Sequence, residues 1–123
     1  MILRDLKTYL ENNGYENIGV DTIFDSPDDS IGLFLYATRP CKDGTCDYAI
    51  QIQVRDKATE KAYERCCDIA RFLDSGIDEE LIDLTPTRYS IIRPTAKTKK
   101  LSHDESKKRT TYYTEISLWS ISD

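Results

Sequence analysis

The chain has 123 residues, which suits a single domain with one hydrophobic core. Apolar residues make up 39% of it and charged residues 32%, which is typical of a globular protein and excludes a disordered one. The net charge is −5, and no apolar run approaches the roughly 20 residues that a membrane helix needs. We therefore expect no membrane partner.

The first third of the chain predicts one helix and two strands. Apolar residues at helical spacing over residues 2–10, followed by the stop signal Asn-Asn-Gly, predict a short amphipathic helix. A weak strand over 18–24, a turn over 25–30, a stronger strand over 31–38 and a loop over 39–47 follow. The opening segment carries acids where a secretion signal has an apolar block, so we expect synthesis in the cytoplasm.

The middle of the chain gives the clearest pattern. Residues 48–55 alternate between apolar and polar side chains, which predicts a strand buried on one face. Asp56 is then expected to cap a helix over about 57–74 that ends before Gly76. The predicted buried stripe of this helix consists of Ala58, Ala62, Cys66, Ile69 and Leu73, widened by Ala70.

The last third predicts two strands that flank a basic segment. Residues 77–86 indicate a turn or a stub of helix, and 87–94 and 111–122 indicate strands. Residues 93–110 are expected to form a mobile, basic, extended hairpin loop, because they contain few apolar residues. The whole chain, 1–123, is predicted to be one α+β domain. Its antiparallel sheet has about five strands, with a long helix on one face and a short N-terminal helix, in the order α-β-β-β-α-β-β.

The four cysteines are interpreted as packing residues or exposed thiols. Cys66 and Cys67 are adjacent and point about 100° apart on a helix, so they are poorly placed to share a metal with Cys41 and Cys46. A disulfide between Cys41 and Cys46 would be incidental and would need an oxidising medium. Cys66 is expected to be buried, with Cys67 at the margin of the core.

No pattern in the sequence indicates an enzyme. His103 is the only histidine and lies in the basic segment, which is a poor platform for a catalytic base. The acidic clusters at 28–29 and 78–83 fit a turn and a helix start without any metal. No glycine-rich phosphate-binding motif is present. We therefore expect no catalytic residues, no cofactor and no metal.

The basic segment is the most informative feature for partners. It combines seven basic residues with two acids, whereas the remainder of the chain carries ten basic and twenty acidic residues. Three interpretations are open: a solvated hairpin tip, docking on an acidic protein surface, or binding of nucleic acid phosphates. The last lacks interleaved aromatic residues for base stacking. The candidate interface residues are Arg93, Lys97, Lys99, Lys100, Lys107, Lys108 and Arg109.

Two stretches together resemble a known family. They are SPDDSIGLFLYAT and YAIQIQVRDKATEKAYERCCDIARFL, and they resemble the tail terminator or minor capsid (tail-completion) proteins of long-tailed phages infecting Gram-positive bacteria. The matching positions are Pro27, Asp28, Ile31, Leu35, Tyr36 and Thr38, then Gln51, Val54, Arg55, Ala62, Tyr63 and Leu73. The segment RPCKDGTC stands where the family commonly has Gly-Gly after the threonine. The order of elements fits over nearly the whole chain.

The resemblance implies a structural role in a virion, at the head–tail junction, after assembly in the host cytoplasm. Such proteins form a ring, usually six-fold, that caps the tail tube, ends its growth and presents a surface to the head connector. The implied partners are further copies of the chain, the major tail tube protein and a head-completion or connector protein. DNA would pass through the ring without specific binding.

Two alternatives stay open. The chain is a small nucleic-acid-binding accessory protein that uses the basic hairpin, or it is a neighbouring head-completion (stopper) protein. For the leading interpretation, Arg55 is a further candidate for a contact between subunits, because alternation places it on the face opposite Val54.

Overall fold

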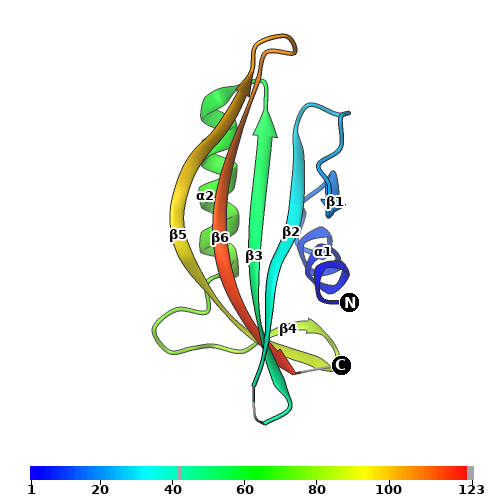
Figure 1. Cartoon of the computed structure of the whole chain (residues 1–123), viewed down its shortest axis with the longest axis vertical. Helices are drawn as coiled ribbons and strands as arrows, with labels where there is room; N and C mark the ends of the chain where they lie inside the picture. Colours follow the sequence, from blue (N-terminus) through cyan, green and yellow to red (C-terminus); the bar gives the residue numbers. More distant parts are fainter. Residues whose placement is uncertain (42, 122–123) are drawn as a thin grey trace.

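The computed structural model describes residues 1–41 and 43–121. Figure 1 shows a long, curled sheet with helices behind it. The elements in these residues are α1 (Ile2–Asn12), β1 (Ile18–Val20), β2 (Ser30–Pro40), β3 (Thr45–Asp56), α2 (Thr59–Leu73), β4 (Ile82–Thr85), β5 (Arg88–Asp104) and β6 (Arg109–Ile121).

The sheet has the strand order β1-β2-β3-β6-β5-β4. All neighbours pair antiparallel except β1 and β2, which are parallel. The α+β class is therefore confirmed, whereas the prediction of a wholly antiparallel sheet of about five strands is wrong. A sixth strand, β4, forms where we expected a turn or a stub of helix, because its backbone pairs with the start of β5.

The parallel pair arises because residues 21–29 form a crossover and not a hairpin. Gly32 in β2 makes room for this crossover, since a Cβ atom there would stand 2.9 Å from the Thr22 carbonyl oxygen. The crossover returns the chain to Ser30, next to Arg55 in the register of β2 and β3. We name residues 21–29 the crossover loop.

Both helices pack against the same face of the sheet. Tyr9 of α1 stacks on Phe72 of α2, with 5.6 Å between ring centroids. The predicted alternation in β3 is confirmed, since Ile50, Ile52 and Val54 are fully buried under the helices. In α2 the buried residues are Ala62, Cys66, Ile69 and Leu73, as the helical period predicted, and Ala70 is half-buried. The prediction is wrong for Ala58, which is exposed and precedes the helix as its N-cap residue.

The start of α2 differs from the prediction. The helix begins at Thr59 with Ala58 as its N-cap residue, and Asp56 is the last residue of β3. The Asp56 carboxylate accepts a hydrogen bond from the Ala58 amide at 3.0 Å. Asp56 therefore shapes the turn between strand and helix, and the predicted cap is wrong by two residues.

The basic segment is folded, which corrects our expectation of a mobile loop. β5 runs without a break to Asp104 and pairs with β6 down to the pair Asp104 and Arg109. The Asp104 carboxylate accepts hydrogen bonds from the backbone amides of Ser106 and Lys107, which closes a tight turn. The segment forms a strand despite its few apolar residues because the backbone of β6 supplies its hydrogen-bonding partners.

Candidate protein–protein interface

Arg55 is occupied inside the molecule. It is 6% exposed, and its guanidinium group donates hydrogen bonds to backbone carbonyl oxygens of the crossover loop. The distances are 3.0 Å to Asp28 and 2.9 Å to Pro27, and the carbonyl of Phe24 is a further acceptor. The structure therefore gives Arg55 a role in holding this loop, which leaves its guanidinium unavailable for the subunit contact that we expected.

Arg109, the first residue of β6, holds the same loop from the other side. It is 7% exposed and donates to the Asp25 backbone oxygen and to the Asp25 carboxylate, each at 2.7 Å. A weaker bond of 3.3 Å reaches the Asp28 carboxylate. Lys107 Nζ lies 2.6 Å from the Asp25 carboxylate. The hydrogen bonds from Lys107 and then Arg109 lower the pKa of Asp25 to about 2.

Two further basic residues have acidic partners within the chain. Arg93 pairs with Glu79 in the segment between α2 and β4. Lys108 lies 3.3 Å from Glu105 within the hairpin turn. Both pairs are exposed, so each contributes little to stability.

The remaining three basic residues are free of such partners. In the described part of the chain, Lys97, Lys99 and Lys100 form no ion pair, and all three side chains are exposed. They lie on β5, whose outer neighbour β4 pairs only with residues Arg88–Ser90. The outer edge of β5 is therefore left without a neighbouring strand beyond this point. Figure 1 shows β5 in yellow at the left margin of the sheet.

A groove lies between this part of β5 and α2. Its volume is about 590 Å³, within the range of pockets that hold ligands or side chains. Its charged lining residues are Arg71 and Lys97, and no acidic residue lines it. Arg71 pairs with Asp68 on its own helix. We name this cavity the α2–β5 groove; its other lining residues are Tyr63, Cys67, Ala70, Pro94, Thr95, Ala96, Thr98 and Thr114.

The opposite edge of the sheet has the opposite charge. Residues 1–30, which include α1, β1 and the crossover loop, contain seven acidic and two basic residues. Three of these acids, Asp5, Asp25 and Asp28, pair with basic residues elsewhere in the chain. Asp21 and Asp29 are exposed and form no ion pair with the residues that the structure describes. Phe24, in the same loop, is 39% exposed. One sheet therefore has a basic outer edge at β5 and an acidic side at β1.

The sheet face away from the helices is covered by a network of polar and aromatic groups. The Tyr36 hydroxyl donates to the Glu115 carboxylate at 2.6 Å, and Ser117 donates to Asp47 at 2.6 Å. Burial and then the hydrogen bond to Glu115 raise the pKa of Tyr36 to about 12. These groups satisfy one another, and Trp119 likewise donates to Thr45 at 3.0 Å.

The cysteines lie in two places, Cys41 and Cys46 at the end of the β2–β3 hairpin and Cys66 and Cys67 in α2, and His103 lies on β5. Cys66 is fully buried, and this burial raises the pKa of its thiol to about 12. Cys67 is half-buried in the α2–β5 groove, and His103 hydrogen-bonds to Thr110 at 2.7 Å. All four cysteines are free thiols. Among residues 1–41 and 43–121, no three histidine, cysteine or acidic side chains gather as a metal site.

Comparison with models of known protein families and with curated protein sequences gives no match for this chain. In the described part of the chain, neither helix has the length and apolar character needed to cross a bilayer.

Proposed function

We propose that the chain is a structural phage protein that caps the tail tube as a ring, ends tail growth and provides the interface to the head connector. Neighbouring copies associate head to tail, and the contact carries no catalytic chemistry. The major tail tube protein and a head-completion protein are the other partners in this proposal. Its place is the head–tail junction of the virion.

The observation that carries the proposal is the opposite charge of the two sides of one sheet. A head-to-tail contact joins two different surfaces of identical copies and closes into a ring when the rotation between them fits. Lys97, Lys99 and Lys100 supply free positive charge on one edge, while Asp21 and Asp29 supply free negative charge on the other side. Complementary charges of this kind favour the correct register between copies.

The same charges disfavour the simplest alternative association. An unpaired strand edge tends to pair with its own copy around a two-fold axis, which would extend the sheet. Two β5 edges brought together would place three lysines of each copy side by side. Lysines on an edge strand are a common device against such pairing. The basic edge of β5 therefore selects an acidic partner.

The order of elements supports the same family resemblance. A short helix, the hairpin of β2 and β3, a long helix and the final hairpin of β5 and β6 occur in the order that the resemblance implies. This order of elements is consistent with the proposed function.

The experiment replaces Lys97, Lys99 and Lys100 with glutamate and measures assembly by sedimentation velocity and electron microscopy. We expect the wild-type chain to form closed rings and to end the growth of its tail tube, and the triple variant to stay unassembled. Lys61→Glu is the control, because this exposed residue of α2 does not line the groove. Rings in the triple variant that match those of the wild type would contradict the proposal.

A DNA-binding measurement distinguishes the proposed ring-forming protein from a nucleic-acid-binding accessory protein. A nucleic-acid-binding protein would bind duplex DNA with an affinity that falls steeply as salt rises. We expect no such binding at physiological salt, because the lysines stand on a chain of net charge −5. Tight, salt-dependent binding without ring formation would favour the accessory-protein interpretation.

A further inference from the structure

The crossover loop is held in one shape although it lies at the surface. Arg55 and Arg109 are both nearly buried, and together they donate to backbone oxygens of Phe24, Asp25, Pro27 and Asp28. Placing two guanidinium groups under a loop is costly unless their hydrogen bonds are satisfied, and of their nitrogen atoms only Arg109 Nε is buried without a partner among the residues that the structure describes. The arrangement holds the backbone at Phe24, whose side chain is 39% exposed. Ordering of the backbone before binding lowers the entropy lost in the contact, and aromatic side chains are common anchors of protein interfaces.

The acidic residues around Phe24 give the loop a polar rim. Asp21 and Asp29 flank it in sequence and have exposed carboxylates. An aromatic side chain with charged neighbours matches the usual layout of an interface, in which an apolar centre is surrounded by polar groups. The partner surface should then be an apolar groove with a basic rim.

The α2–β5 groove has these properties. Pro94, Ala96 and Ala70 supply apolar surface, and the ring of Tyr63 lies at its wall. Arg71 and Lys97 are its only charged lining groups in the part of the chain that the structure describes, and both are basic. A volume of about 590 Å³ accommodates an aromatic ring together with neighbouring loop residues.

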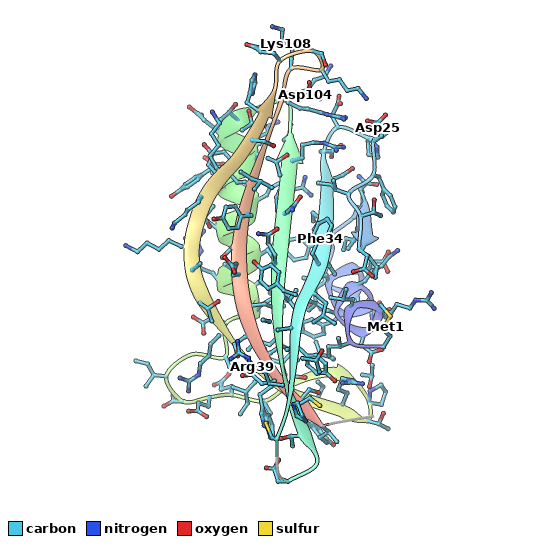
Figure 2. All side chains as sticks on the ribbon, in the orientation of Figure 1. Met1, Asp25, Phe34, Arg39, Asp104 and Lys108 are labelled. Atoms are coloured by element: carbon cyan, nitrogen blue, oxygen red, sulfur yellow. The ribbon has the colours of Figure 1, made fainter. Side chains whose placement is uncertain are left out.

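The loop and the groove lie on opposite sides of the molecule. In Figure 2 the labelled Asp25 lies at the upper right, beside the start of β2, whereas β5 is at the left margin. The strand order agrees, since β1 and β5 are separated by three strands. One copy therefore cannot insert its own loop into its own groove, and the contact must join two copies.

We propose that Phe24 of one copy inserts into the α2–β5 groove of the next copy, with Asp21 and Asp29 facing Lys97 and Arg71. This inference rests on the proposed ring, for which it names the contact between neighbours. Because the two surfaces differ, each copy offers one loop and one groove. The contact propagates from copy to copy until the ring closes.

Several other large apolar side chains are exposed, and Ile77 is the most exposed of those that the structure describes. Ile77 is fully exposed and lies between α2 and β4. The ion pair of Glu79 with Arg93 ties this segment to β5. Ile77 does not line the groove, so it serves as a matched control for Phe24.

Disulfide trapping tests the contact directly. Cys67 lines the groove, so Phe24→Cys should form an intermolecular disulfide with it under mild oxidation. Cys41 and Cys46 are changed to serine to remove competing thiols, and Cys66 stays because it is fully buried. We expect a ladder of linked species beyond two copies, with the 24–67 link identified by mass spectrometry. The ladder should vanish when Cys67→Ala is added.

A second experiment compares the assembly of Phe24→Asp with that of Ile77→Asp. It tests the contact even if the cysteine variant associates poorly. We expect Phe24→Asp to weaken assembly at least tenfold and Ile77→Asp to leave it unchanged. Two results together would overturn this inference and leave the proposed ring standing. They are normal rings in Phe24→Asp and no 24–67 disulfide in Phe24→Cys. Linked species that stop at two copies would also overturn the inference, because the contact would then be reciprocal. A wild-type chain that never forms rings and never caps tail tubes would instead contradict the proposed function.

Discussion

Arg109 holds Asp25 through two hydrogen bonds of 2.7 Å, one to its backbone oxygen and one to its carboxylate. The two residues are separated by 84 positions in the chain. This contact fixes the crossover loop to the start of β6, next to the hairpin turn. It joins a segment from the acidic side of the molecule to the strand pair that carries the basic residues.

Arg55→Met should destabilise the fold by about 2–4 kcal/mol, because several loop carbonyls lose a charged hydrogen-bond donor. Urea denaturation measures this as a lower midpoint with an unchanged slope. The exposed Lys61→Met is the control and should stay within about 0.5 kcal/mol of the wild type. Equal midpoints for Arg55→Met and the wild type would contradict the role of Arg55.

The hold on the crossover loop should weaken in acid. The pKa of Asp25 is lowered from 3.8 to about 2, first by the hydrogen bond from Lys107 and then by that from Arg109. Because the pKa of Asp25 is lowered in the folded state, its ionised carboxylate stabilises the fold above about pH 4. This stabilisation is lost as the pH falls through 2. A carboxyl carbon titration by NMR should give a midpoint near 2 for Asp25. A midpoint near 4 would show that the contacts with Lys107 and Arg109 do not form.

Gly32→Ala should loosen the crossover loop. A Cβ atom at this position would lie 2.9 Å from the Thr22 carbonyl oxygen and 2.7 Å from the Phe34 ring, so the backbone of the loop must move. We expect a loss of about 1–3 kcal/mol in stability. Hydrogen exchange should become faster at residues 22–29 and stay unchanged in the pair of β3 and β6. Unchanged exchange in the loop would contradict its close packing on Gly32.

The cysteines should differ sharply in reactivity. Cys66 is fully buried and its pKa is raised to about 12, so little thiolate is present at neutral pH. Cys41 is exposed. Iodoacetamide followed by peptide mass spectrometry should label Cys41 in the native chain and Cys66 only after denaturation. Labelling of both at similar rates would contradict the packing of α2 on the sheet.

Sequence periodicity was sufficient for the elements that have one buried face. The alternation over 48–55 and the helical stripe of Cys66, Ile69 and Leu73 both appear as predicted. Periodicity failed for β5 beyond Pro94, where charged residues dominate and pairing with β6 decides the structure. It also failed for β4, because so short a strand depends on pairing with β5. The strand predicted over 18–24 is present as β1, but it is shorter, and its parallel pairing with β2 was not predicted.

The candidate interface was predicted only in part. The basic segment was found by composition, but composition does not distinguish lysines that are free from basic residues that are already paired. Arg55 and Arg109 look like surface residues in an alternating pattern, and only the crossover loop, which covers them, makes them buried. Local spacing likewise gave no sign of the α2–β5 groove, because it combines α2, β5 and β6.

Sedimentation velocity of the wild-type chain and of the Lys97, Lys99 and Lys100 glutamate variant, at low and high salt, tests whether these lysines hold neighbouring copies together in a ring. We predict one closed species of more than two 14.2 kDa copies for the wild type at low salt, dissociating as salt rises. The triple variant should remain a monomer under all conditions. A wild-type chain that remains a monomer or dimer at every concentration, or a triple variant that assembles like the wild type, would contradict the account.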